Sequence, residues 1–319
     1  MESKQIVKEQ KKVNFAKFLS SIPANDYIFQ DMSYMEQTAH AAKMIEQADA
    51  ILIGAGAGLS TAAGLSYGGK RFTDNFAEFI EKYGRMYMRD MYSAGFYPFP
   101  TQEAKWGYWS KHAFMNRVEP EGLEVYQKVY QLVKDKPHFV LTTNVDHQFW
   151  KAGFADEVIF ATQGDYGLIQ CEKACHNKTY DAIELFKQMN QAGKDCMIPA
   201  YMVPKCPVCG GNMTMNLRCD QYFVEDEHWH QAAYRFETFL QEYENKKIVL
   251  LELGVGFNTP TIIRFPFEKM MREYENYMLI RLNLEEAEIP ECFGKRAVGI
   301  NRDIAESIID IAKSVKEGG

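Results

Sequence analysis

The fold class is decided by the stretch Ala50-Ile51-Leu52-Ile53-Gly54-Ala55-Gly56-Ala57-Gly58-Leu59-Ser60. A short apolar run that ends in alternating glycines is typical of a buried parallel strand turning into a helix. Glycines at such a turn let the backbone approach a pyrophosphate, and the helix N-terminus supplies N–H donors. The stretch lacks the third glycine of the dinucleotide fingerprint and the Gly-Lys-Ser/Thr ending of the P-loop. It therefore predicts a dinucleotide loop of another kind, with a tight turn that binds nothing as the alternative.

Further apolar runs follow, and helical patterns separate them. They lie at residues 138–142, 158–161, 248–253 and 277–282. Alternating strands and helices predict an α/β fold, a Rossmann-like open parallel sheet with helices on both faces. Ligands bind such sheets at the carboxyl ends of the strands. Ser33 and Glu36 resemble a capping box, which predicts a helix over 33–48, and a C-terminal helix is expected near 303–314.

Two paired cysteine motifs lie between the third and fourth predicted strands. They are Cys171-x3-Cys175 and Cys206-x2-Cys209, a spacing that predicts a structural zinc site. Four thiolates close a tetrahedron and leave no open position for catalysis. The metal is therefore expected to hold a small module together.

These signals divide the chain into four parts. We expect an N-terminal helical extension over 1–47, a Rossmann-like dinucleotide-binding domain over 48–165 and 245–319, a helical insertion over 66–130, and a small zinc-ribbon/helical module over 166–244. The insertion is rich in aromatic and methionine residues, which are predicted to form its helical core: Phe72, Phe76, Phe79, Tyr83, Met86, Tyr87, Met88, Met91, Tyr92 and Phe96.

Composition excludes several classes of protein. With 46% hydrophobic and 25% charged residues the chain is globular, and its net charge of −7 argues against non-specific nucleic-acid binding. The N-terminus is charged and has no apolar core of a signal peptide. Residues 50–69 carry no charge but contain six glycines, which fits a loop better than a membrane span. A cytoplasmic protein is expected.

Three features together resemble the sirtuin family. Gly56-Ala57-Gly58-Leu59-Ser60 resembles the sirtuin Gly-Ala-Gly-x-Ser loop, and Thr142-Thr143-Asn144-Val145-Asp146 resembles the Thr-Gln-Asn-x-Asp motif. The paired cysteines resemble the zinc module. Leu253-Gly254-Val255-Gly256 stands where sirtuins carry Gly-Thr-Ser, and 281–285 resembles their strand that ends in Asn near the adenosine ribose.

Two departures change what the resemblance implies. Sirtuins carry a His-Gly pair whose histidine is the base for deacylation, whereas this chain has Gln163-Gly164. A glutamine side chain cannot titrate, so it cannot take that proton. The chain also has 65–69 in place of Ile-Pro-Asp-Phe-Arg, and neither Arg71 nor Arg85 is in register with the missing arginine.

With glutamine at this position, the chain resembles the microbial macrodomain-linked sirtuins, class M. That resemblance implies NAD-dependent protein mono-ADP-ribosylation with release of nicotinamide. It also implies a lipoyl-carrying acceptor, like the glycine-cleavage H protein, and a macrodomain hydrolase as partner.

The resemblance also implies a role for each matching residue. Asn144, Asp146 and Gln163 are expected to be catalytic, with the backbone of Val145 helping Asp146 to hold the carboxamide. The pyrophosphate is expected to lie on Gly56, Ala57, Gly58 and Ser60. The adenosine ribose is expected beside Gly254, Gly256, Asn283 and Glu285.

Two other functions compete with this one. The first is an NAD-dependent lysine deacylase in which Asp165 or His147 replaces the missing base. The second is a non-catalytic sensor of NAD or ADP-ribose. Release of nicotinamide separates the sensor from the enzymes, and the fate of ADP-ribose separates the two enzymes.

Overall fold

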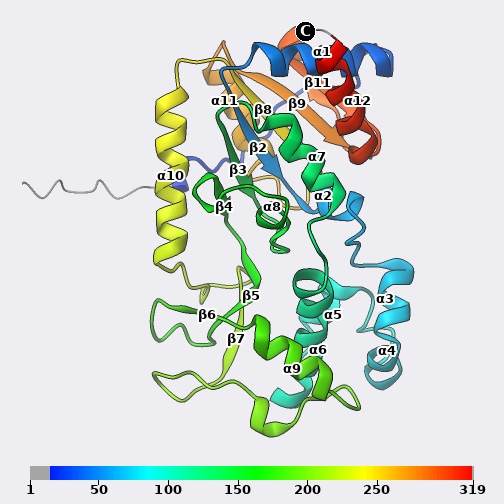
Figure 1. Ribbon diagram of the computed structural model, residues 1–319, viewed down its shortest axis with the longest axis vertical. Coiled ribbons are helices and arrows are strands. Elements are labelled where there is room, and N and C mark those ends of the chain that lie inside the picture. Colours follow the sequence, from blue (N-terminus) through cyan, green and yellow to red (C-terminus); the bar gives the residue numbers. More distant parts are fainter. Residues whose placement is uncertain (1–14, 318–319) are drawn as a thin grey trace, which may run out of the picture.

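The computed structural model describes residues 15–317, with side chains through 315, and its main feature is a sheet of six parallel strands (Figure 1). All five strand pairings are parallel, which confirms the predicted α/β class. In spatial order the strands are β11 (Ala297–Asn301), β9 (Met278–Asn283), β8 (Ile248–Leu253), β2 (Ala50–Ala55), β3 (His138–Thr142) and β4 (Ile159–Ala161).

The edge strand β11 was not predicted, because its apolar run is short and interrupted by Gly299. A Cβ atom on Gly299 would lie 2.0 Å from the carbonyl oxygen of Ala287. Because the backbone at Ala287 lies so close, only glycine fits at this position of the strand.

Helices cover both faces of the sheet, as predicted. Ile51 and Ile53 point into the core of one face, and Leu52 points into the core of the other. One face carries α1 (Tyr34–Gln47), α2 (Ala57–Ala62), α7 (Glu124–Val133), α8 (Gln148–Lys151) and α12 (Ile304–Glu317). The other face carries α10 (Glu227–Tyr243) and α11 (Arg264–Glu273). Strands buried on both faces explain the continuous apolar runs of the sequence.

The strand order places a topological switch at β2. The chain runs from β2 to β3 on one side and later returns as β8 on the other side. The carboxyl ends of β2 and β8 therefore flank the crevice in which open α/β sheets bind ligands.

Two insertions lie together beyond this edge of the sheet (Figure 1). The first comprises α3 (Gly69–Asn75), α4 (Ala77–Tyr83), α5 (Met91–Gly95), α6 (Gln102–Ala113) and the π-helical turn η2 (Phe114–Val118). The second comprises β5 (Gly164–Cys171), β6 (Thr179–Asp181), α9 (Ile183–Ala192), η4 (Ala200–Met202) and β7 (Met213–Leu217). Trp106 of the first insertion shares a core with Phe186 of the second. The domain boundaries read from the sequence stay a prediction.

The aromatic segment of the first insertion is only partly core. Phe72, Phe76 and Phe79 are buried as predicted, as are Met88 and Met91. Four others are between 53% and 65% exposed, so the prediction was wrong for Met86, Tyr87, Tyr92 and Phe96.

The N-terminal part also differs from the prediction. Residues 1–14 of the expected helical extension lie outside the described residues. Between 15 and 30 the chain forms one 3-10 turn, η1 (Phe15–Lys17), and a short strand, β1 (Tyr27–Ile28). β1 pairs with β10 (Ile289–Pro290), just before the turn η5 (Glu291–Arg296). The helix at 34–47 begins at the expected Ser33–Glu36 capping box and packs on α12.

No helix within residues 15–317 is both long enough and apolar enough to span a bilayer.

Candidate active site

The glycine loop joins β2 to α2 and packs against the loop after β8. Gly58 N donates to Gly254 O at 2.9 Å, and Gly56 N donates to Leu253 O at 3.0 Å. A Cβ atom on Gly58 would lie 2.7 Å from Gly254 Cα, and Gly254 itself has φ of +62°. These glycines are needed because two backbones meet at the switch point. The exposed Ala57 begins α2 between them.

Behind this loop lies a buried polar network centred on Tyr126 of α7. Asn144 Nδ2 donates to the Tyr126 hydroxyl at 3.2 Å, and that hydroxyl donates to Asp146 Oδ2 at 3.2 Å. Ser60 Oγ donates to the same carboxylate oxygen at 2.6 Å. All four side chains are less than 9% exposed. The structure therefore brings together three of the residues singled out from the sequence.

Burial raises the pKa of both ionisable side chains in this network. It raises the pKa of Asp146 above its usual value, although the hydrogen bond from Ser60 acts in the opposite direction. Burial also raises the pKa of Tyr126, which keeps its hydroxyl neutral and able to donate. The Ser60 hydroxyl donates to Asp146 in this structure, and its contact with the pyrophosphate stays a prediction. Tyr126 belongs to no motif, and only the helical periodicity of 124–133 indicates that it is buried.

Gln163 lies at the carboxyl end of β4 and is half-buried. Its side-chain Nε2 lies 3.4 Å from Thr162 Oγ1, and its backbone carbonyl accepts from Arg218 N at 3.0 Å. Arg218 also donates through Nε to Thr162 O and pairs with Glu225 at 2.7 Å. Its guanidinium lies 4.1 Å from the centre of the Phe223 ring. The sequence reading missed Arg218, which follows the second cysteine pair outside any recognised motif.

His147 and Asp165 form a second polar pair near the same strand ends. His147 Nδ1 lies 2.5 Å from Asp165 Oδ2, and Arg117 Nε donates to Asp165 Oδ1 at 2.8 Å. Burial alone would raise the pKa of Asp165, but the bond from His147 and the charges of His147 and Arg117 lower it below its usual value. The backbone of His147 has φ of +63°, a strained conformation that persists only where the surroundings impose it.

A cavity of about 380 Å³ opens beside this pair. Its wall includes His147 and Trp150 of α8, Asp165 of β5, and His228 and Trp229 of α10. It lies between the edge of the sheet and the second insertion. None of the residues expected to hold the pyrophosphate lines it.

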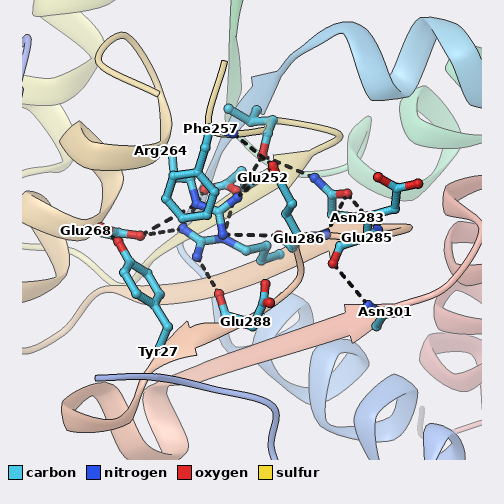
Figure 2. Close-up of polar contacts among 12 residues, drawn as sticks. Tyr27, Glu252, Phe257, Arg264, Glu268, Asn283, Glu285, Glu286, Glu288 and Asn301 are labelled. Carbon is cyan, nitrogen blue, oxygen red and sulfur yellow. Dashed lines mark hydrogen bonds and ion pairs between the residues drawn. The ribbon is translucent and has the colours of Figure 1, made fainter. Parts of the chain in front are cut away.

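The loops after β8 and β9 are joined beside the crevice (Figure 2). Asn283 Nδ2 donates to Val255 O at 3.2 Å, and its Oδ1 accepts from the backbone N–H groups of Glu285 and Glu286. A Cβ atom on Gly256 would lie 2.7 Å from Glu286 Oε2. Glu285 points to solvent. The structure thus brings Gly254, Gly256 and Asn283 together.

A fully buried charge network supports these two loops (Figure 2). Arg264 donates to Val255 O and to Glu286 O, each at 3.1 Å. Its neighbours are Glu268 of the same helix, and Arg281, which pairs with Glu268 at 2.9 Å and with Glu252 at 2.7 Å. Burial alone would lower the pKa of Arg281, but the two carboxylates raise it above its usual value. The only sequence signal was one charge in each of two otherwise apolar strands.

The four predicted cysteine ligands meet in the second insertion. Their sulfur atoms all lie within 4.8 Å of one another, and Cys171–Cys209 and Cys175–Cys206 are 3.7 and 3.6 Å apart. Zinc–sulfur bonds of about 2.3 Å in a tetrahedron separate the sulfurs by about 3.8 Å. The cluster therefore fits a structural zinc.

The two arginines compared with the missing loop arginine have different surroundings. Arg71 donates to Ser66 O, Met115 O and Asn116 Oδ1, so it ties the 65–69 loop to η2. Arg85 is exposed on the first insertion. The carbonyl of Val145, the remaining predicted site residue, accepts from Tyr166 N at 2.9 Å.

Comparison with known proteins gives two similar sequences and many similar structures. The chain is 36% identical over 265 residues to a protein ADP-ribosyltransferase of Staphylococcus aureus, and the match covers 83% of each chain. It is 32% identical over 242 residues to a probable bifunctional ADP-ribose hydrolase/ADP-ribosyltransferase of Fusarium oxysporum f. sp. cubense, covering 72% of this chain and 39% of the relative. No protein-family model matches the chain.

Among solved structures, a Sir2 homologue–NAD complex has a TM-score of 0.58 at 14% identity, covering 92% of this chain and 98% of the homologue. A Sir2 homologue–ADP-ribose complex has a TM-score of 0.56 at 13% identity, covering 87% and 96%. At such identities the likeness shows the fold, which is that of the Sir2 homologues.

Proposed function

This chain belongs to the family of sirtuin-like protein ADP-ribosyltransferases, and on that premise we propose that it cleaves NAD and transfers the ADP-ribosyl group to a protein side chain. The bond between nicotinamide and the ribose breaks, and its electron pair leaves with nicotinamide. The acceptor side chain forms the new bond to the anomeric carbon, and any proton it carries is lost to solvent or to a base.

The observation that carries this proposal is the buried network at the carboxyl ends of β2 and β3. Because Asn144 Nδ2 is held by Tyr126, the amide oxygen is left for the ribose, on which positive charge develops. Asp146 is held from both sides by Ser60 and by Gln148 N. A carboxylate held in this way can orient the nicotinamide carboxamide without moving during the reaction.

The remaining contacts to NAD follow from the positions of the loops. We assign the pyrophosphate to the backbone of Gly56, Ala57 and Gly58, and the side chain of Ser60 to the orientation of Asp146. The adenosine ribose lies against Gly254 and Gly256 in this proposal. Asn283 and Glu285 approach it from β9.

Gln163 favours transfer over deacylation. An amide binds the ribose hydroxyls or orients the acceptor, but it cannot take the proton that deacylation requires. One observation supports a lysine deacylase as second candidate. His147 is oriented by the buried Asp165 and lines a cavity, which is the geometry of a general base with its orienting group.

We further propose a lipoylated carrier protein, like the glycine-cleavage H protein, as the acceptor. The Fusarium relative is named for both an ADP-ribose hydrolase and an ADP-ribosyltransferase, which supports a macrodomain hydrolase as the partner that removes the modification. The zinc has a structural task in this proposal and takes no part in the reaction.

The test is the intact mass of a lipoylated carrier after incubation with this enzyme and NAD. A parallel reaction contains an acetyl-lysine peptide, and free nicotinamide is measured in both. We expect the carrier to gain one ADP-ribose and the peptide to stay unchanged. Asn144→Ala should abolish the gain, whereas Asn190→Ala on α9 should not.

Other results would decide between the alternatives. Loss of the acetyl group would establish the deacylase. Nicotinamide release with neither substrate changed would rule out this acceptor, and binding of NAD with no nicotinamide release would establish the sensor.

A further inference from the structure

The first insertion carries a cluster of exposed apolar side chains that the proposed reaction does not use. We name Met86, Tyr87, Tyr92 and Phe96 the aromatic patch. They are 65%, 53%, 62% and 55% exposed and fall within eleven consecutive residues. The rings of Tyr92 and Phe96 are 5.0 Å apart, so the two form one surface. The Tyr87 ring lies 5.5 Å from that of Tyr97, one residue beyond Phe96 in the sequence. Exposed apolar surface of this kind marks sites that contact another molecule.

The patch is a fixed platform, because the residues between its members are firmly held. Met91 is fully buried, its N–H donates to Tyr67 O at 2.8 Å, and its carbonyl accepts from the Tyr108 hydroxyl at 2.5 Å. Asp90 caps α5 by accepting from Ser93 N at 2.8 Å. A rigid apolar surface binds a partner at a lower entropic cost than one that must first become ordered.

These contacts also connect the patch to the active site. Tyr67 belongs to the 65–69 loop, which connects α2 to the first insertion. Its hydroxyl lies 2.9 Å from that of Tyr166, whose N–H donates to Val145 O. A protein bound at the patch would therefore lie against the segment that leads into the buried network.

The charge beside the patch indicates the kind of partner. Arg85 and Arg89 are exposed, and within residues 15–317 neither forms an ion pair. Arg89 Nε donates only to Met86 O, and the carboxylate of Asp90 is occupied by Ser93. The patch thus carries two unneutralised guanidinium groups on a chain whose net charge is −7.

This charge argues for an acidic partner and against a second copy of the chain. A two-fold interface is self-complementary and would bring the arginines of one copy close to those of the other. An acidic surface with an apolar centre complements both features.

We propose that the aromatic patch docks the protein acceptor, and that the acceptor presents an acidic surface with an apolar centre to it. This inference rests on the proposed ADP-ribosyl transfer and specifies how that reaction selects its protein substrate. The patch takes no part in NAD cleavage.

The experiment measures binding of a lipoylated carrier protein to the full chain by titration calorimetry, at low and at high salt. Two double variants test the patch, Tyr92→Ser with Phe96→Ser, and Arg85→Glu with Arg89→Glu. The control is Tyr201→Ser, because Tyr201 is 87% exposed on η4 in the other insertion. All of these side chains are exposed, so the variants should fold, and a melting curve checks this.

We expect each patch variant to bind the carrier about tenfold or more weakly and to modify it correspondingly more slowly. High salt should weaken the binding of the wild-type chain and have little effect on the arginine variant. Nicotinamide release from NAD alone should stay unchanged in every variant, as should carrier binding by Tyr201→Ser.

Three results would overturn the proposal. If the wild-type chain modifies the carrier and the patch variants do so equally well, the docking surface is wrong while the proposed function stands. If the patch variants only convert a dimer to a monomer in sedimentation, the patch is a self-interface. If the wild-type chain cleaves NAD but neither binds nor modifies the carrier, the acceptor assignment and the docking proposal fail together.

Discussion

The hydroxyl of Tyr126 forms hydrogen bonds with three polar side chains of the site, those of Ser60, Asn144 and Asp146. Tyr126→Phe keeps the ring and its edge-to-face contact with Phe149 at 4.9 Å. We expect nicotinamide release to lose about tenfold or more in kcat with little change in KM for NAD, because the amide of Asn144 is no longer oriented. The free energy of unfolding should fall by only about 1 kcal/mol. The matched control is Tyr108→Phe, which loses a buried hydroxyl outside the site; equal kcat losses in both variants would refute this role.

Asp165 makes the stability of the folded protein depend on pH in the acid range. Its pKa is lower in the folded state, so the carboxylate stabilises the fold above the pKa that it has in the unfolded chain. That stabilisation is lost as the pH falls through the folded-state value. Asp165→Asn leaves Arg117 without its counter-ion and should lower the free energy of unfolding by about 3 kcal/mol at neutral pH. The melting temperatures of the two proteins should converge as the pH falls below 4, and a difference independent of pH would contradict the assignment.

At the scale of elements, the loops after β8 and β9 act as one unit because Arg264 of α11 holds both. Arg264→Lys keeps the buried positive charge but cannot reach both carbonyl groups. We expect KM for NAD to rise about fivefold while kcat stays close to the wild-type value, because the loops bind the adenosine end and not the reacting bond. Arg272→Lys, at the exposed end of the same helix, is the control. A fall in kcat with unchanged KM would show that the network serves the chemistry instead.

At the scale of the whole molecule, the zinc site and the first insertion depend on each other through their common core. Removing zinc with a chelator should disorder the second insertion and loosen α6, since Trp106 packs against Phe186 there. We expect calorimetry to show a first unfolding transition at a lower temperature, followed by unfolding of the sheet at a higher one. Transfer of ADP-ribose to the carrier should be lost. Cys292→Ser, at an exposed cysteine outside the cluster, should change neither zinc content nor melting. Unchanged melting after complete zinc removal would argue against a structural metal.

The sequence predicts features that depend on neighbouring residues and misses those that depend on contacts between distant segments. The strand and glycines at 50–58 and the cysteine pairs are local patterns with a direct physical cause, and the structure confirms the sheet and the cysteine cluster. Tyr126, Arg218 and Arg264 were missed because their contacts join segments far apart in the chain. Composition showed that 72–96 is aromatic but not which side chains face water.

The position of β2 also has a consequence for how this chain folds. Its two neighbours come late, since Ile51 pairs with His138 and Ala50 pairs with Ile248, roughly 200 residues further on. During synthesis β2 therefore keeps one open edge until β8 has been made, after roughly three-quarters of the chain. An open apolar edge recruits other strands. We therefore expect nascent chains that end before β8 to aggregate more readily than chains that include it, because β8 covers the open edge of β2.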